Sequence, residues 1–455
     1  MTPWRTGWIA IWLWGWALAA QAAIFQTQLD NGMTILVKAD HRAPVVAHMV
    51  WYRVGANYEL NGITGISHVL EHMMFKGTEK LAPGEFSRRV ARLGGQENAF
   101  TSRDYTAYFQ TVGKQHLAQV MALEAERMRH LKLAEDQFQK ERNVVLEERR
   151  WRVEDNPEAR LFELFRAQAF VNSPMRHPVI GWRTDIEALT LADLADWYKR
   201  WYAPNNAILV VVGDVQADEV VALAKQYYGA FKAETIRPPK PQKEQRQQGE
   251  RRLTLKAAVE VPTVVMGFHV PSLLTAENEK EAWALELAAA VLAGDASSRL
   301  ARQLVRGRKV AAMADAGYNA TALWDPLFTL SARPAQGQSV ETLEQALWAE
   351  VEKLKREPVS QAELARVLAQ AEAQQVYSRD SVMGQAMVMG MLASVGLPPD
   401  LADRWAEKLR QITPADIQAV AQKYFTRENL TVGVLLPNGE KPHKVPRAMM
   451  GGHVR

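Results

Sequence analysis

The chain has 455 residues, of which 47% are hydrophobic and 23% charged, so we expect a globular protein with two domains of about 200 residues each. The net charge of +4 arises from interspersed acidic and basic residues, a pattern that does not indicate nucleic-acid binding. Because the chain has no cysteine, disulfides, a lipoprotein anchor and thiolate ligands are excluded, and any metal must be held by histidines and carboxylates.

The first 22 residues have the pattern of a secretory signal peptide. Arg5 is their only charged residue, an apolar run extends over residues 7–20, and small residues precede a cleavage position before Ala23. We therefore expect a periplasmic or secreted mature chain with no stable membrane insertion. A stripe of tryptophans at four-residue spacing leaves a second option, an uncleaved segment that anchors the chain at the membrane interface.

The next informative stretch is His68-Val-Leu-Glu71-His72. Residues four apart on a helix share one face, so both imidazoles can direct a ring nitrogen at a single ion. The order H-x-x-E-H is the inverted form of the H-E-x-x-H zinc signature. The pattern predicts two metal ligands, His68 and His72, with Glu71 beside them as a candidate base. The alternative is a solvated helix face that carries incidental histidines.

A catalytic zinc site needs a third protein ligand and leaves one position open. The helix-forming segment from Glu141 to Trp151 offers candidates. Glu141 and Glu148 are two turns apart on one face, whereas Glu147 is rotated by about 100° from that face. The helix phase therefore selects Glu141 and Glu148 as a pair, although a charged surface helix would have the same pattern.

The two halves of the chain resemble each other across a linker rich in proline and charge. Residues 190–202 and 413–425 each have the pattern of a capped helix, and each precedes an apolar strand at the same spacing. The apolar segment 44–51 has a counterpart at 262–269, but the second half has the apolar residues 285–292 where the first has its histidines.

We therefore predict a duplicated α+β fold, in which each domain is a mostly antiparallel sheet covered by helices. The expected parts are a signal peptide (1–22), a zinc-bearing catalytic domain (23–232), the linker (233–252), a homologous non-catalytic domain (253–440) and a flexible basic tail (441–455).

These motifs together resemble the pitrilysin/insulysin family of metallopeptidases, in its short two-domain form, over nearly all of the mature chain. In that family an inverted zinc motif is followed by a segment like E-R-x-V-V-L-E-E, whose final glutamate binds the metal. The resemblance implies one Zn²⁺ per chain, held by His68, His72 and Glu148, with Glu71 as general base. It also implies that Glu141 steadies the site from behind the ligands.

Further matches to the family are Gly94-Gly95, residues 98–101, residues 106–108, residues 177–182 and residues 298–300. In the family, an edge strand that binds substrate lies at the match over residues 98–101. The resemblance therefore implies that Asn98, Ala99 and Phe100 pair with an extended or unfolded peptide by strand addition. An ordinary strand with no substrate role is the alternative.

One departure from the family pattern concerns the second half of the chain. Active members use an arginine and a tyrosine there, in a pattern like L-R-x-x-x-x-L-x-Y. Arg306 can supply the arginine and bind substrate, but the tyrosine position holds Met313, or Ala312 in a gapless reading. Tyr318 could compensate only after a local shift.

Short members of the family often pair a zinc-bearing subunit with a homologous zinc-less subunit that carries the arginine and tyrosine. We therefore expect a heterodimer, with a homodimer as the other option. The expected function is a zinc-dependent endopeptidase that hydrolyses extended or unfolded peptides in the periplasm. The alternative is a non-catalytic peptide-binding or assembly subunit on the same scaffold.

Overall fold

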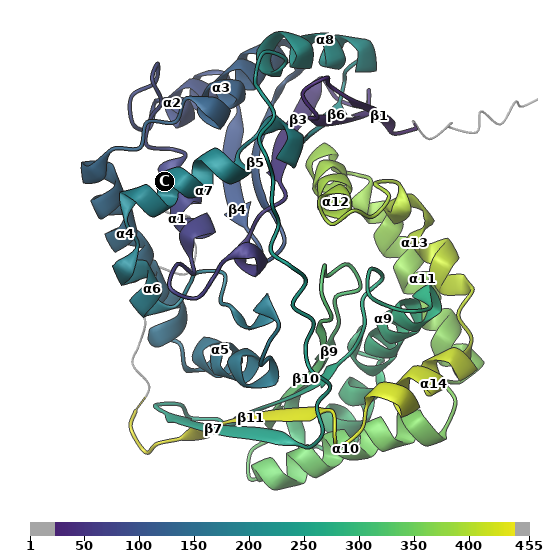
Figure 1. Ribbon diagram of the computed structural model, residues 1–455. Coiled ribbons are helices and arrows are strands. Elements are labelled where there is room, and N and C mark those ends of the chain that lie inside the picture. The colour runs from purple at the N-terminus through teal and green to yellow at the C-terminus, as the bar shows by residue number, and fades with distance from the viewer. Residues whose placement is uncertain (1–22, 442–455) are drawn as a thin grey trace, which may run out of the picture.

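Two mixed, mostly antiparallel sheets with helices organise the chain, which confirms the predicted α+β class and its duplication (Figure 1). The computed structural model describes residues 23–441, so the expected signal peptide and all but the first residue of the expected tail lie outside the described residues. Within that range, no helix combines the length and the apolar character that crossing a membrane requires.

The first sheet has six strands, and only its β2–β6 pair is parallel. In spatial order the strands are β1 (Phe25–Gln28), β2 (Thr34–Ala39), β6 (Ala207–Gly213), β3 (Val45–Tyr52), β5 (Thr106–Gly113) and β4 (Gln96–Thr101). The helices of this half are α1 (Ile66–Met73), α2 (Glu85–Arg92), α3 (Leu117–Arg129), α4 (Glu135–Arg149), α5 (Pro157–Ala169), α6 (Arg183–Ala188), α7 (Leu191–Trp201) and α8 (Ala217–Tyr228).

The second sheet repeats this topology with five strands, and again one pair, β7–β11, is parallel. In spatial order the strands are β7 (Arg251–Ala257), β11 (Leu430–Pro437), β8 (Thr263–His269), β10 (Leu327–Pro334) and β9 (Ala311–Gly317). The helices of this half are α9 (Glu279–Ala293), the π-helix η6 (Ala301–Gly307), α10 (Val340–Arg356), α11 (Gln361–Ser378), α12 (Val382–Ser394), α13 (Leu401–Arg410) and α14 (Pro414–Tyr424). Between α8 and β7, where the linker is expected, the chain has neither helix nor strand.

The repeated helix–strand units are built by the same local chemistry. Thr190 and Asp193 form a capping box at the start of α7, and Thr413 and Asp416 form the equivalent box at the start of α14. Each box satisfies backbone N–H groups that a helix start would otherwise leave unpaired. Each helix then leads into the buried central strand of its own sheet, β6 or β11.

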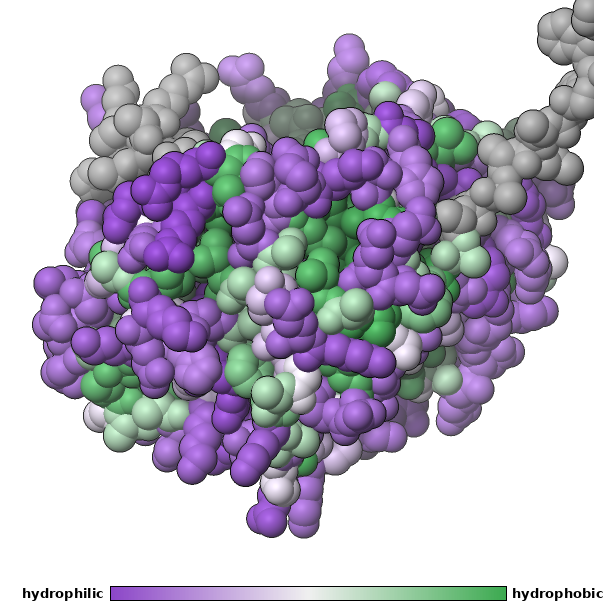
Figure 2. Space-filling model, turned by 90° about the horizontal axis from the view of Figure 1, so that it is seen from above, coloured by the Kyte–Doolittle hydropathy of each residue, from purple (hydrophilic) through white to green (hydrophobic). Residues whose placement is uncertain are grey.

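Each sheet has one face covered by its own helices and the other face covered by a helix from the opposite half. Helix α12 packs on β3 and β6 of the first sheet, and α5 packs on β7, β8 and β11 of the second. Because strand side chains alternate between the two faces, both faces of the central strands are apolar, as burial on both sides requires. Seen from above, hydrophobic residues show in the middle of a mainly hydrophilic face (Figure 2).

This reciprocal packing is close enough to require a glycine. A Cβ atom at Gly390 in α12 would lie 2.1 Å from the indole of Trp51 in β3, far inside van der Waals contact. The two halves therefore form one packed body that fixes the position of α1 and β4, the elements with the expected site residues.

Candidate metal centre

Helix α1 presents both histidines of the expected site, and its start is held by backbone contacts. Its N-cap residue Gly65 has φ 86°, a left-handed conformation that favours glycine. The buried carboxylate of Glu59 accepts hydrogen bonds from the backbone N–H groups of Gly65 (2.7 Å) and Ser67 (2.9 Å). Glu59 thus occupies the positive end of the helix, where a carboxylate is favoured.

A second glycine lets another segment approach this helix start. Gly181 has φ +89°, and a Cβ atom there would lie 2.5 Å from the carbonyl oxygen of Thr64. The carbonyl of Gly181 accepts a hydrogen bond of 2.7 Å from Arg149, whose guanidinium also forms two 2.8 Å hydrogen bonds with Glu163 in α5. The start of α1, the end of α4 and helix α5 are therefore tied together at one point.

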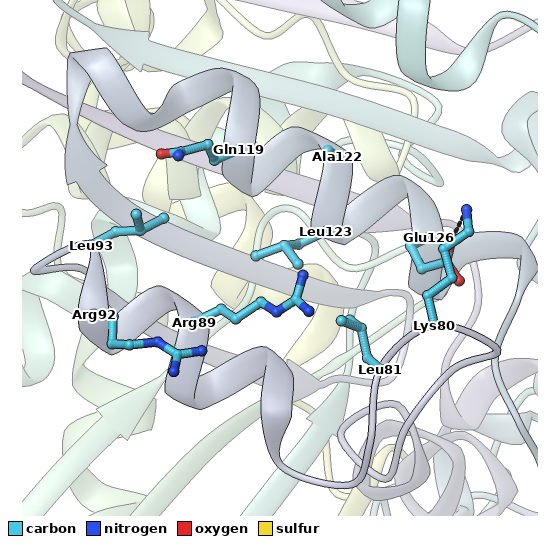
Figure 3. Close-up of a pocket in the computed structure, with 9 residues that line it drawn as sticks. All are labelled: Lys80, Leu81, Arg89, Arg92, Leu93, Gln119, Ala122, Leu123 and Glu126. Carbon is cyan, nitrogen blue, oxygen red and sulfur yellow. Dashed lines mark hydrogen bonds and ion pairs between the residues drawn. The ribbon is translucent and has the colours of Figure 1, made fainter.

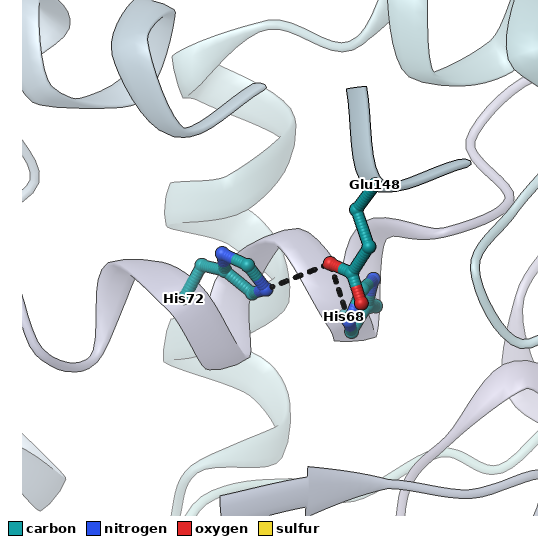
Figure 4. Close-up of side chains that lie close together, drawn as sticks. All are labelled: His68, His72 and Glu148. Atoms are coloured by element: carbon teal, nitrogen blue, oxygen red, sulfur yellow. Dashed lines mark ion pairs between the residues drawn. The ribbon is translucent and has the colours of Figure 1, made fainter. Parts of the chain in front are cut away.

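Helix α4 brings Glu148 against the two histidines (Figure 4). Its Oε2 atom lies 3.7 Å from Nε2 of His68 and 3.4 Å from Nε2 of His72. Side-chain burial is high, with exposed fractions of 10%, 19% and 11% for His68, His72 and Glu148. The neighbouring Glu147 is largely exposed and pairs with Arg150, so the helix phase distinguishes the two consecutive glutamates as the sequence predicts.

The histidines and Glu148 have further charged neighbours. Nδ1 of His72 lies 3.3 Å from Oε2 of Glu141, whose other oxygen pairs with Lys76 at 2.9 Å. Arg152 contacts the remaining oxygen of Glu148 at 2.7 Å. Glu141 thus contacts the ring nitrogen of His72 that does not face Glu148.

The protonation states follow from burial and these neighbours. Burial and the charge of His72 lower the pKa of His68 to about 3, so His68 is neutral. Burial opposes the charged form of His72, but hydrogen bonds to Glu141 and Glu148 outweigh it and raise its pKa to about 9. Burial also opposes the charge of Glu148, yet His72, His68 and Arg152 together lower its pKa to about 2.

These three side chains fit a zinc ion. Ligand atoms bound to one tetrahedral zinc at about 2.1 Å lie about 3.4 Å apart, close to the separations of Glu148 from the two histidines. The set has two imidazoles and one ionised carboxylate, and a cation would replace the proton that His72 now shares with two carboxylates. Within residues 23–441, this is the single group of three side chains with a metal-binding arrangement.

The side chain of Glu71 contacts strand β4, whereas the two histidines contact Glu148. Its Oε2 atom accepts a 2.5 Å hydrogen bond from the hydroxyl of Thr101, the last residue of β4. Burial raises the pKa of Glu71, and the Thr101 hydroxyl opposes this shift. A carboxylate with a raised pKa next to a metal-binding group is suited to take up and release a proton.

Strand β4 lies at the edge of the first sheet and pairs only with β5 in the part of the chain that the structure describes. Asn98, Ala99 and Phe100 all belong to it. The side chain of Ala99 is buried, and the Phe100 ring packs edge-on against Trp51. The Asn98 side chain accepts a 2.9 Å hydrogen bond from the N–H of Ala99. The backbone of β4, not these side chains, is therefore the part that a peptide strand would pair with.

The second half does not bring a tyrosine hydroxyl to this site. Met313 lies on edge strand β9 and is 46% exposed. The hydroxyl of Tyr318 donates a 2.6 Å hydrogen bond to the carbonyl of Pro271, and its ring stacks on Phe328, so Tyr318 is held in its own domain. Arg306 is exposed on η6. Helix α9, which stands where α1 stands in the first half, carries no metal-binding group.

A surface hollow lies away from the histidines, between α2 and α3 (Figure 3). It combines leucines with basic residues and shares no residue with the metal-binding group. The residues lining it are Lys80, Leu81, Arg89, Arg92, Leu93, Gln119, Ala122, Leu123 and Glu126.

Sequence reasoning missed several residues that hold the site. Glu59, Arg149 and Arg152 act through tertiary contacts that no short pattern reveals. Gly181 stood in a matched motif without an assigned role. The one usable signal was Gly65, since a glycine directly before a predicted helix indicates a backbone constraint at its start.

Comparison with known proteins places the chain in a family. Residues 34–182 match the family model described as Insulinase (Peptidase family M16), and residues 188–371 match that of the Peptidase M16 inactive domain. The zinc protease PqqE of Helicobacter pylori is 32% identical over 415 residues, which are 90% of this chain and 92% of that protein. The chain belongs to the insulinase family of peptidases.

Other relatives and solved structures agree with this assignment to the insulinase family. An uncharacterised zinc protease of Bacillus subtilis, YmxG, is 25% identical over 91% of this chain and 98% of its own. The crystal structure of a protease from Helicobacter pylori matches with a TM-score of 0.86 and 31% identity, over 91% of this chain and all of that one. The periplasmic protease PqqL of Escherichia coli shares the fold, with a TM-score of 0.75 at 21% identity, over 91% of this chain and 47% of that one. The inactive-domain match agrees with the second half up to residue 441, in which no metal-binding group is found.

The contact between Gly181 and the start of α1 can be tested with two alanine substitutions. Gly181→Ala should destabilise the protein by at least about 2 kcal/mol more than Gly94→Ala and weaken zinc binding about tenfold, because the added methyl pushes α1 away. Gly94 is the matched control, since its φ is also positive (+70°) but a Cβ atom there meets nothing within 4 Å. Chemical denaturation and zinc titration measure both effects. Equal losses in the two variants would show that backbone strain alone matters.

Proposed function

We propose that the chain is a zinc-dependent endopeptidase that hydrolyses extended or unfolded peptides. The observation that carries this proposal is the convergence of His68, His72 and Glu148 on one point, with Glu71 on the same helix turned toward edge strand β4. Membership of the insulinase family and the zinc-protease names of its relatives support it.

In this proposal His68, His72 and Glu148 hold one zinc ion, and Glu141 and Arg152 hold the ligands in place. When bound, zinc supplies a Lewis acid that polarises a peptide carbonyl and acidifies a water. The backbone of β4 holds the substrate in an extended form by adding it to the sheet edge, a mode that tolerates many sequences.

Proton transfer is the role of Glu71. The Thr101 hydroxyl occupies Oε2, so Oε1 remains to accept a proton from the attacking water. Glu71 then returns this proton to the nitrogen of the leaving amine, which completes hydrolysis of the peptide bond. Burial of the carboxyl favours the uptake of the proton, because it raises the pKa of Glu71.

Glu71→Gln tests this assignment. The variant should bind zinc as the parent does, because Glu71 is not a ligand, but its kcat should fall at least about a hundredfold, because it has no base. Zinc content and hydrolysis of a quenched fluorescent peptide give the two measurements. Glu147→Gln is the matched control, since Glu147 is exposed and pairs only with Arg150 among the described residues. Hydrolysis at the parental rate by Glu71→Gln would remove Glu71 from the mechanism.

We further propose that the site is completed by a homologous subunit without zinc ligands. The support is local: Met313 stands at the expected tyrosine position, and Tyr318 is bound to Pro271. Such a subunit would supply the arginine and tyrosine, while Arg306 of this chain lies exposed on η6. We also propose that the protein acts in the periplasm after cleavage before Ala23, on the basis of the N-terminal sequence.

The partner proposal predicts low activity of the chain alone. Adding the zinc-less homologous subunit should raise kcat about a hundredfold, the effect typical of one added group that stabilises an oxyanion. Peptide hydrolysis by the separate and the mixed proteins measures this. If the rate per mole of chain rises with the concentration of this chain alone, the chain forms a homodimer instead. A full rate in a dilute monomer would contradict the need for any partner.

A further inference from the structure

Two arginines near the reaction centre lack an ion-pair partner. Arg103 lies in the turn between β4 and β5, and Arg166 lies on α5. Neither guanidinium has an ion pair or a hydrogen bond within residues 23–441, and the Nε atoms of both are buried and unpaired. Three arginines with little exposure are paired, Arg127 with Glu124, Arg149 with Glu163 and Arg299 with Glu363. Arg53 is half-buried like Arg103 and Arg166 and also has no ion pair among the described residues.

The carboxylate next to Arg103 in the sequence, that of Asp104, already accepts hydrogen bonds from other groups. Both oxygens of Asp104 accept hydrogen bonds, one from the side chain of Asn57 at 2.6 Å and one from the backbone N–H of Leu323 at 3.2 Å. The second bond joins the turn after β4 to the other half of the chain. Arg103 is therefore beside an acidic residue that is committed to structural contacts.

The two guanidinium groups also act on each other. Burial lowers the pKa of Arg103, and the charge of Asp104 opposes the shift. Burial and the charge of Arg103 lower the pKa of Arg166 to about 9. Two like charges that are partly removed from water and form no ion pair are costly, and an incoming anion would relieve this cost.

An anion bound by Arg103 and Arg166 would lie close to the bond that is cleaved. Glu71 binds the hydroxyl of Thr101, and Arg103 follows two residues later, a span of at most about 7 Å along the chain. A peptide that pairs with the free edge of β4 would run past this turn. Arg166 belongs to α5, the helix that also packs on the second sheet, and its guanidinium lies 5.6 Å from the centre of the Phe170 ring.

We propose that Arg103 and Arg166 form a subsite that binds an Asp or Glu side chain of the peptide within about three residues of the scissile bond. A guanidinium presents paired N–H donors that match a carboxylate, so two of them select acidic over neutral side chains. The inference deepens the proposed peptidase function and rests on it. It gives a substrate preference to a site whose backbone pairing is otherwise tolerant of sequence.

The test compares peptides that differ by Glu or Gln at one position around a fixed cleavage site. The Glu71→Gln protein, loaded with zinc, should bind the best Glu peptide at least about tenfold more tightly than its Gln counterpart in fluorescence anisotropy. Arg103→Gln and Arg166→Gln should each remove most of this difference, so that the Glu and Gln peptides bind the variant with nearly equal affinity. Arg92→Gln, an exposed arginine on α2, is the control and should retain the full preference.

Lysine variants and amidated peptides distinguish loss of the subsite from poor folding and from binding of the peptide terminus. Arg103→Lys and Arg166→Lys keep the charge, so they should retain part of the preference even if a glutamine variant folds poorly. Peptides with amidated C-termini show whether the bound group is a side chain or the terminal carboxylate; a preference that disappears on amidation contradicts a side-chain subsite. Equal binding of Glu and Gln peptides at every position would overturn the inference while leaving the peptidase proposal intact. Loss of all hydrolysis in the zinc-loaded parent and its mixture with the homologous subunit would instead contradict the peptidase proposal.

Discussion

The functional arrangement depends on one contact, the packing of α4 against α1 that places the carboxylate of Glu148 between two imidazoles. This contact brings charged groups together in a poorly solvated position, where hydrogen bonds to Glu141 and Glu148 outweigh burial and raise the pKa of His72. A cluster of this kind persists only where the surrounding structure holds it. Here Glu59, Gly181 and Arg149 hold the helix start and the helix end that carry it.

The duplicated architecture provides that rigid frame. Each half covers its own sheet on one face, while α5 and α12 cross to the sheet of the other half. Neither sheet is fully buried without the opposite half, so the second half is needed even though its described residues form no metal-binding group. The same exchange brings Arg166 on α5 and the loop around Leu323 beside the turn after β4. Residues from distant parts of the chain thereby border the reaction centre.

Features that follow from local periodicity could be predicted from the sequence. The capped helices at Thr190 and Thr413, the strands that follow them and the choice of Glu148 over Glu147 all depend on spacing within one element. Edge strand β4 was also expected, because the family resemblance assigned it.

Features that arise between elements could not be predicted in this way. An amphipathic pattern says that a helix buries one face but not against which sheet, so the exchange of α5 and α12 was missed. The close approach of Gly65 and Gly181 and the hydrogen bonds of Glu59 depend on loops that meet only in the folded chain. The unpaired state of Arg103 and Arg166 is likewise a tertiary property, since both look like ordinary surface arginines in the sequence.

We propose that His68, His72 and Glu148 form one zinc site. The most direct measurement is the metal content of the purified chain, compared with that of a Glu148→Ala variant whose folding is verified by circular dichroism. We expect about one zinc per parent chain and a large loss of zinc in the variant, because three protein ligands are needed for a stable site. A folded parent chain without zinc, or a variant that retains the full zinc content, would contradict it.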